Sequence, residues 1–337
     1  MNDPAEIGPV AADDPASEDS TVAERAERDG LYGPASEAWR LNREAVLLLG
    51  AGPRALLMQI AHPLVAEGVD QHSDFRTDPW GRLQATIRSY LTIVYGSRST
   101  ARAEIRRLAG LHRSIVGPVR DPAAASATGA TSYAARDPGL SLWVHATLVD
   151  STIVAHDAWI ERLPRARREA FYAETRPIGR AFGVPERLLP ADLHAFEAYI
   201  AGMIGPDGPV HPTATSRELA RTILRPPLAP LVRTLEPSLH RGIGPDAASG
   251  MAAAIEGVLG AIPAAAYDWT IWPAVALLPV PLRDEFGIGW GPDRRVVASW
   301  LATGFRAWRP ILPAAFRQMP QALAAGRRVA SPDPAQR

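Results

Sequence analysis

The spacing of apolar residues is the feature that most restricts what this chain can fold into. From Trp39 onward, large apolar residues recur at intervals of three and four, which places them on one face of a helix. Strand signals are scarce, because no run of alternating β-branched residues is bounded by hairpin turns. We therefore expect one all-α domain, a bundle-like set of helices with a pocket between them and little or no β-structure. The helices are predicted at residues 36–50, 53–68, 79–95, 98–116, 139–162, 165–182, 190–204, 213–225, 245–260 and 293–308.

Composition sets the limits of this domain. Residues 1–29 are rich in Asp, Glu, Ala, Ser and Pro and are expected to be disordered or loosely attached. The folded domain is predicted over residues 30–324, followed by a flexible polar tail at 325–337. Within the domain, residues 118–138 have the composition of a loop, and 226–236 and 273–292 are expected to be connectors rich in proline and glycine.

Helix boundaries can be inferred from the residues that cap and interrupt helices. The stretch 47-LLLGAGPRALLMQIAHP-63 resembles a dinucleotide-binding loop only superficially, since the third glycine and the surrounding βαβ pattern are absent. We expect its glycines and Pro53 to end one helix and begin the next. Asp78 followed by proline predicts a helix start, Ser99 or Thr100 should cap the next helix, and Gly117 should stop it.

Composition also excludes several classes of function. The formal net charge of zero favours neither nucleic acid nor acidic membrane as a partner, and the absence of cysteine excludes disulfides, thiolate metal sites and cysteine nucleophiles. The N-terminus lacks the pattern of a secretory signal. The most apolar stretch, 261–282, carries Asp268 and several prolines and is not expected to span a membrane. The predicted location is the cytoplasm.

The eight histidines show none of the common metal or hydrolase motifs. No HxxxH or HExxH pair is present, no paired ExxH elements occur, and there is no GxSxG turn for a nucleophilic serine. A site built from several histidines is therefore not expected. One histidine alone can still hold a haem, because haem iron needs only one axial ligand from the protein.

His112 is the candidate for such a ligand. It falls in one helical stripe with Ile105, Leu108, Ile115 and Val116. Two interpretations follow from spacing alone: a haem ligand, or an interior histidine that is hydrogen-bonded to a carbonyl group. The same choice applies to His145 on another apolar helix, which shares a face with His156 about three turns away.

Two further residues fit a haem pocket. Arg82 and Thr86 lie four residues apart on one predicted helix and could present a cation and a hydroxyl to the same pocket. A cation is what the two propionates of a haem require at the pocket edge. The alternatives are a surface or ion-pair role for Arg82 and a filler role within the helix for Thr86.

The order of the short motifs resembles one family over roughly residues 35 to 300. The motifs are GPRALL, QIAHPLVAEGV, HSDF, DPWGRLQAT, YG, HRSIVG and YAARDPGLSLWVHATLVDS. They are similar to those of the oxygenase family that includes the fungal ER-bound oxygenase MpaB and the catalytic domain of the rubber oxygenase (latex-clearing protein). The resemblance implies an all-α fold that carries a b-type haem between helices, with His112 as axial ligand after the Arg82 and Thr86 element. Characterised members use dioxygen to cleave carbon–carbon double bonds in isoprenoid chains.

The sequence departs from that family at the distal side. The latex-clearing branch has a lysine directly before the threonine, which can occupy the iron in a closed state, and here that residue is Ala85. The resemblance also implies a distal acid, for which Glu67 is the candidate, with a solvated carboxylate at a helix end as the alternative. His145 could be a hydrogen-bond donor behind the ligand, a propionate contact or the ligand itself, and Trp143 is expected to wall the haem slot.

Together these observations predict a haem b-dependent oxygenase, an oxidoreductase that acts with dioxygen on a small apolar substrate, isoprenoid or alkene in nature. A redox partner would fit such chemistry. The alternatives are a non-catalytic protein that binds haem or an apolar ligand, and a peroxide-dependent haem enzyme.

Overall fold

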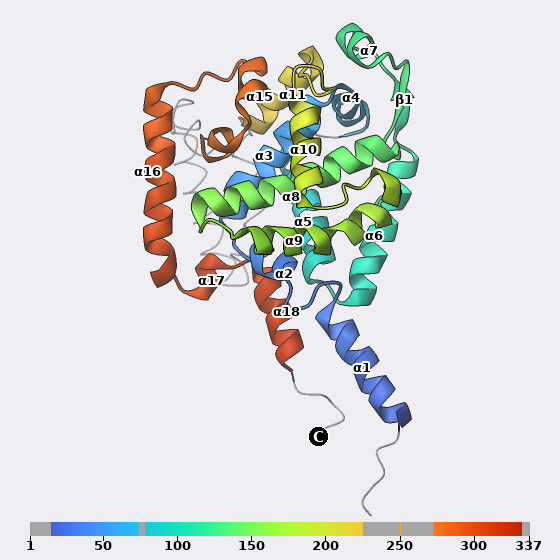
Figure 1. The fold of residues 1–337 in the computed structure, drawn as a ribbon, viewed down its shortest axis with the longest axis vertical. Coiled ribbons are helices and arrows are strands. Elements are labelled where there is room, and N and C mark those ends of the chain that lie inside the picture. The colour runs from blue at the N-terminus through green and yellow to red at the C-terminus, as the bar shows by residue number, and fades with distance from the viewer. Residues whose placement is uncertain (1–14, 74–77, 225–249, 251–271, 332–337) are drawn as a thin grey trace, which may run out of the picture.

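Two long helices that pack against each other form the centre of the molecule. In this computed structural model, which describes residues 15–73, 78–224, 250 and 272–331, helix α3 (Leu47–Ala61) packs along helix α8 (Pro138–Trp159). Figure 1 shows α8 crossing the middle of the bundle with α3 beside it. Trp143 of α8 is fully buried, and its indole N–H donates to the carbonyl oxygen of Met58 in α3 over 3.1 Å. Apolar burial of this kind is the main stabilising contribution to the fold.

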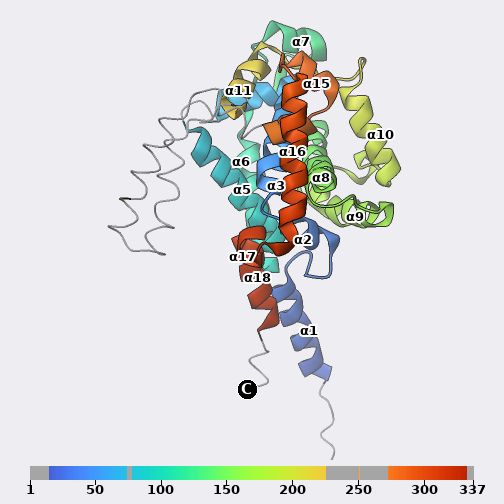
Figure 2. The same cartoon turned by 90° about the vertical axis from the view of Figure 1, so that its left-hand side faces the viewer.

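The described residues contain fifteen α-helices and one two-stranded sheet, which confirms the predicted all-α class. The remaining elements surround the central pair (Figure 1, Figure 2). They are α1 (Pro15–Asp29), α2 (Glu37–Asn42), α4 (Pro63–His72), α5 (Pro79–Tyr95), α6 (Arg98–Arg113), β1 (Val116–Pro118), α7 (Pro122–Thr128), β2 (Ser132–Ala134), α9 (Arg165–Ala181), η2 (Glu186–Leu188), α10 (Leu193–Ile204), α11 (Ala214–Leu224), α15 (Val280–Glu285), α16 (Pro292–Trp308), η3 (Arg309–Ile311), α17 (Ala314–Arg317) and α18 (Pro320–Ala330).

The start of α3 corrects one sequence prediction. Gly50, Gly52 and Pro53 do not separate two helices, because all three lie inside α3. Gly50 has a packing role there: a Cβ atom at this position would lie 3.2 Å from a methyl group of Leu277. The break comes later, at His62, whose imidazole accepts a hydrogen bond from the backbone N–H of Leu64 and so caps α4.

Two predicted caps can be compared directly with the structure. Asp78 caps α5 as expected, and its carboxylate accepts from the N–H of Gly81 over 2.9 Å. The cap of α6 is Ser97 rather than Ser99 or Thr100, and its hydroxyl accepts from the N–H of Thr100. The prediction missed it because serine and threonine occupy several neighbouring positions, and each is a competent cap.

The segment predicted as a loop at 118–138 contains regular structure. Strands β1 and β2 pair antiparallel, with Gly117 opposite Tyr133, and α7 lies between them. The strands are three residues each, too short to show an alternating pattern in the sequence. Asp121 caps α7 and also accepts from the N–H and hydroxyl of Thr215, which ties the hairpin to α11.

Both ends of the described chain differ from the prediction. Residues 15–29, expected to be disordered, form helix α1, whose Glu27 accepts hydrogen bonds from Ser99 at the start of α6. Ala325, expected to begin a frayed tail, is fully buried in α18. Arg328 of α18 donates to the backbone oxygens of Arg28 and Tyr95, so α1 and α18 are held to the bundle by polar contacts that composition does not reveal.

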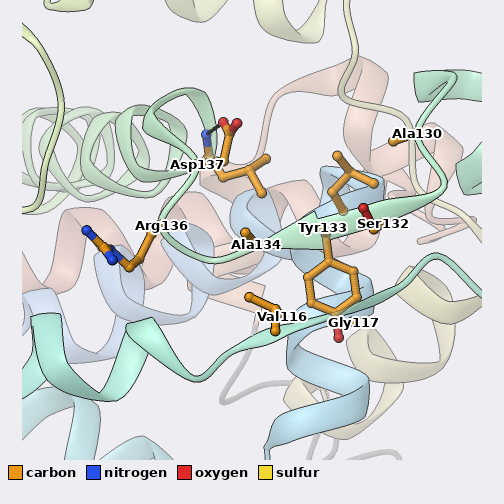
Figure 3. Close-up of a pocket in the computed structure, with 10 residues that line it drawn as sticks. Val116, Gly117, Ala130, Ser132, Tyr133, Ala134, Arg136 and Asp137 are labelled. Atoms are coloured by element: carbon orange, nitrogen blue, oxygen red, sulfur yellow. Dashed lines mark hydrogen bonds between the residues drawn. The ribbon is translucent and has the colours of Figure 1, made fainter.

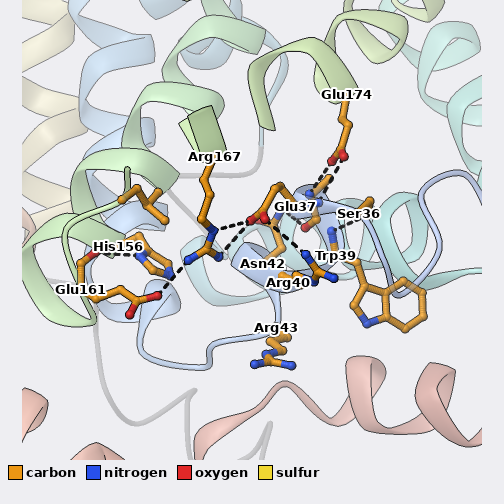
Figure 4. Close-up of polar contacts among 12 residues, drawn as sticks. Ser36, Glu37, Trp39, Arg40, Asn42, Arg43, His156, Glu161, Arg167 and Glu174 are labelled. Carbon is orange, nitrogen blue, oxygen red and sulfur yellow. Dashed lines mark hydrogen bonds and ion pairs between the residues drawn. The ribbon is translucent and has the colours of Figure 1, made fainter. Parts of the chain in front are cut away.

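Ion pairs also fix the outer helices to one another. Figure 4 shows Arg167 of α9 between Glu37 of α2 and Glu161 after α8, while Glu174 of α9 accepts from the backbone N–H groups at the start of α2. Near the other end of α2, the fully buried Glu44 carboxylate pairs with Arg309 through two hydrogen bonds. Such two-point pairs hold the geometry more closely than single contacts do.

Some predictions fall outside the described residues. These are the helix at 245–260, apart from residue 250, the connector at 226–236 and most of the apolar stretch 261–282. Residues 273–277 of the predicted connector 273–292 are helical, as is α15. Within the part of the chain that the structure describes, no helix combines the length and apolar character needed to cross a lipid bilayer.

Candidate functional site

His112 lies in the last turn of α6, on the side that faces the end of α9. Its ring centre is 6.3 Å from that of Phe182, and the two ring planes are tilted by 49°. The side chain is half-buried. Within the described residues its ring nitrogens make no hydrogen bond, so the interpretation as an interior histidine bonded to a carbonyl group is not what the structure contains.

The surroundings of His112 favour its neutral form. Burial lowers the pKa of the imidazole, and the positive charge of Arg82 on α5 lowers it further. The structure thus brings together two residues singled out in the sequence, His112 and Arg82, across the contact between α5 and α6. A neutral imidazole with a free nitrogen is the form that binds a metal ion.

Thr86 follows Arg82 by one helical turn and is exposed. Its hydroxyl donates to the backbone oxygen of Arg82 over 3.0 Å, so the oxygen lone pairs remain available to another group. Ala85 beside it is also exposed and carries no group that can ligate a metal.

His145 of α8 is the second buried imidazole without a partner. Its Nε2 atom is buried and has no hydrogen bond to any residue that the structure describes, and burial lowers its pKa to about 4. The ring lies against Gly179 of α9, where a Cβ atom would be 3.3 Å from the His145 ring and 2.9 Å from Leu189. Gly179 and Phe182, one turn apart on α9, therefore face His145 and His112, respectively.

Glu67 does not join this group. The residue is 2% exposed, so the alternative of a solvated carboxylate at a helix end is wrong. Its oxygens accept from the backbone N–H groups of Arg120 and Asp121 over 3.1 and 2.9 Å, and from the amide of Gln71. Two N–H groups at the turn into α7 need an acceptor, and Glu67 supplies it. No contact of Glu67 leads to His112 or Arg82.

Trp143, predicted to wall the haem slot, lies between the two central helices. It is fully buried between α3 and α8 with its only polar group bonded to Met58, which makes it part of the core. The large aromatic residue that does face His112 is Phe182, which sequence reasoning missed. Two glycines near Phe182 could have indicated this position in the sequence. Gly179 marks a close contact between helices, and Gly183, with a φ of 88°, marks the end of α9.

Two other histidines in the family-like motifs have structural contacts. His62 sits at the junction of α3 and α4, where burial lowers its pKa to about 4. His72 is exposed, and one ring nitrogen lies 3.1 Å from the backbone oxygen of Val116 in β1. His62 thus lies at the start of α4, and His72 links the end of α4 to β1. Among the described residues no group of three or more His, Asp or Glu side chains converges as a metal site would.

Comparison with known proteins identifies two relatives of this chain. Two uncharacterized mycobacterial proteins, Mb2261 of Mycobacterium bovis and Rv2237 of Mycobacterium tuberculosis, are each 30% identical to this chain over 150 residues, which is 43% of its length. The match spans only about half of each relative, 55% of its length. No solved structure matches the chain significantly.

The match to a family model is much longer. Residues 39–308, which include the central helices, α5, α6, the hairpin and α16, match the catalytic domain described as ER-bound oxygenase mpaB/B'/Rubber oxygenase. The resemblance inferred from the short motifs is thereby confirmed. This chain belongs to the family of the ER-bound oxygenase mpaB/B' and rubber oxygenase catalytic domain.

Proposed function

We propose that this chain is a haem b-dependent oxygenase in which His112 would hold the haem iron and the substrate is an apolar alkene or isoprenoid chain. The observation that carries the proposal is the His112 imidazole, half-buried and without a hydrogen-bond partner in the described residues, in a chain that belongs to an oxygenase family. A free, neutral ring nitrogen on a helix end is the donor that haem iron requires.

The residues near His112 fit a porphyrin by their chemistry. Arg82 provides a cation for a propionate group, and Thr86 provides a hydroxyl with free lone pairs on the same face of α5. Phe182 gives an apolar ring beside the His112 imidazole. When bound, haem would supply a redox-active iron centre, which the side chains of this chain do not provide by themselves.

The polypeptide itself positions the proposed ligand and influences the protonation of its imidazole. Burial lowers the pKa of His112 and the charge of Arg82 lowers it further, so the surroundings favour the neutral ring with a nitrogen available to a ligand. Because Ala85 has no ligating group, this chain lacks the side chain that closes the distal position in the latex-clearing branch. His145, whose Nε2 is buried beside Gly179, is the alternative ligand if His112 fails.

Reconstitution of the purified protein with haemin tests the ligand. We expect a Soret band with the spectrum of a histidine-bound haem, and dithionite followed by carbon monoxide should shift it. His112→Ala should remove or displace that band, whereas His194→Ala, at an exposed position on α10, should leave it unchanged. Loss of the band in His145→Ala alone would transfer the assignment to His145, and absence of a band in the wild type would refute the haem proposal.

Turnover then separates the proposed oxygenase from its alternatives. The reconstituted enzyme should consume dioxygen when an isoprenoid alkene is added, and Thr86→Val should slow that consumption while the Soret band remains. A carrier would bind the alkene without dioxygen uptake. A peroxide-dependent enzyme would oxidise the alkene only when hydrogen peroxide replaces dioxygen.

A further inference from the structure

A second feature of the molecule has no role in the site described above. A cavity of about 740 Å³ opens beside the β1–β2 hairpin. Its apolar walls come from three separate elements: Leu64 of α4, Val116 and Ala134 of the hairpin, and Leu140 of α8. Figure 3 shows the hairpin residues around it, with the Tyr133 ring closing the side nearest Gly117. The size and the apolar walls suit one small ligand with a hydrocarbon chain.

One charged group at this pocket has no partner. Arg136 lines it, is exposed, and makes no hydrogen bond or ion pair with the described residues. Its neighbour Asp137 makes no ion pair with it, since that carboxylate caps α8 and accepts from the N–H groups of Gly139 and Leu140 over 2.8 and 3.1 Å. In Figure 3 the two side chains point in different directions. Figure 3 shows the Arg136 side chain at the outer rim, directed away from the Tyr133 ring, so an unpaired guanidinium stands at the edge of the apolar space.

The pocket is connected to the His112 end of α6 through the backbone. Val116, one of its walls, lies only four residues beyond His112 in the chain. Between them, the N–H of Ile115 donates to the backbone oxygen of His112 over 3.4 Å, and the N–H of Ala135 donates to the oxygen of Ile115 over 2.9 Å. Residue 135 directly precedes Arg136, so the guanidinium is carried by the strand connection that packs on the end of α6.

We propose that this pocket binds the carboxylate end of an apolar-chain acid, with the carboxylate on Arg136 and the hydrocarbon against Leu64, Val116 and Leu140. A carboxylate is the group whose two oxygens match the fork of a guanidinium. Taken with the proposed function, on which this step rests, the substrate class is an unsaturated or isoprenoid acid, held by its head at the hairpin. Binding of the acid itself does not depend on haem.

Titration calorimetry of the haem-free protein tests the pocket with two probes, a C15 isoprenoid carboxylic acid and the matching C15 alcohol. The acid should bind about fivefold more tightly than the alcohol, the advantage of one partly exposed ion pair. Arg136→Gln should abolish that preference, and Arg136→Lys should keep part of it. Arg187→Gln, at an exposed position of η2 outside the pocket, is the matched control and should change nothing.

Filling the pocket provides an independent test. Ala134→Trp should weaken binding of acid and alcohol alike by more than tenfold, with circular dichroism as the check that the variant is folded. Equal affinity of the wild type for acid and alcohol, or an unchanged preference in Arg136→Gln, would overturn the proposal. Acid binding that depends on Arg136 in a protein without a Soret band would leave the pocket established and refute the haem assignment, while the reverse result would refute only the pocket.

Discussion

The pair α3–α8 and the pair α5–α6 differ in how their polar side chains are paired. In α3–α8, Arg54 of α3 donates to Ser151 and Leu277, each over 2.7 Å, and forms an ion pair with Asp150 over 2.7 Å. In α5–α6 the candidate site residues are less buried: Arg82 and His112 are half-buried, and Thr86 is exposed. His112 has no hydrogen-bond partner among the described residues.

This difference separates residues that hold the fold from residues that remain available to a ligand. A buried group with all its partners contributes to stability and has nothing left to bind. A group at a half-buried position without partners costs little stability and can bind something else. His145 is the exception in the α3–α8 pair, because its Nε2 atom is buried and has no hydrogen bond to the described residues. The predictions below test that division.

The largest effect should come from Arg54. Arg54→Ala leaves Asp150 and a backbone oxygen without their buried donor, so we expect a loss of about 3–5 kcal/mol in the free energy of unfolding. Urea denaturation followed by circular dichroism measures it. Arg102→Ala, at an exposed position of α6, should cost less than about 0.5 kcal/mol. Similar losses in both variants would remove the distinction between the two pairs.

His145 should make stability depend on pH. Its pKa is about 4 in the folded protein against the usual 6.5, so the unfolded chain binds the proton more readily. Stability from this group is complete above pH 6.5 and is lost as pH falls toward 4, by about 3 kcal/mol. Comparing urea midpoints at pH 7 and pH 5, His145→Asn should reduce the difference and His194→Asn should not. An unchanged difference in His145→Asn would show that the ring has a partner in solution.

Trp143 should affect the fold without affecting the site. Trp143→Phe removes the hydrogen bond to Met58 and part of a fully buried ring, at a cost of about 2 kcal/mol. Because the side chain lies in the core and not beside His112, haemin bound per folded molecule should stay the same. Thermal unfolding and the haemin titration are both needed. A weaker haemin affinity with unchanged stability would restore Trp143 to the pocket wall.

The smallest effect on stability is expected at Thr86. Its side chain is exposed and bonds only to its own helix, so Thr86→Val should change the free energy of unfolding by less than about 0.5 kcal/mol. The same urea titration detects the change. A loss above about 1 kcal/mol would show that Thr86 supports the α5–α6 pair instead of remaining available to a ligand.

The sequence predicted the long helices well because their apolar stripes are long. The predicted 79–95 is α5 itself, and 165–182 and 293–308 differ from α9 and α16 by one residue. It failed where tertiary contact overrides local preference: Pro53 stays inside α3, and α1 and α18 are held by contacts between distant segments. The hairpin was missed because its strands are so short.

The candidate site was predictable only in part. His112 and Arg82 were identified from helix spacing and motif order, and the structure places them close enough for the charge of one to lower the pKa of the other. The role of Glu67 was not predictable, since its partners at residues 120 and 121 lie more than fifty positions away in the chain. Spacing also cannot tell whether an aromatic residue on an apolar helix faces a pocket or a core, so it predicted Trp143 and gave no signal for the contact of Phe182 with His112.

The pairing of α1 with α18 has a practical consequence. Both helices project from the same pole of the bundle, and the hairpin with α7 lies at the opposite pole (Figure 1, Figure 2). A tether attached beyond either helix would therefore leave the molecule oriented with its hairpin pointing outward. Immobilised by one end on a sensor or a bead, the protein would present the Arg136 pocket to the passing solution.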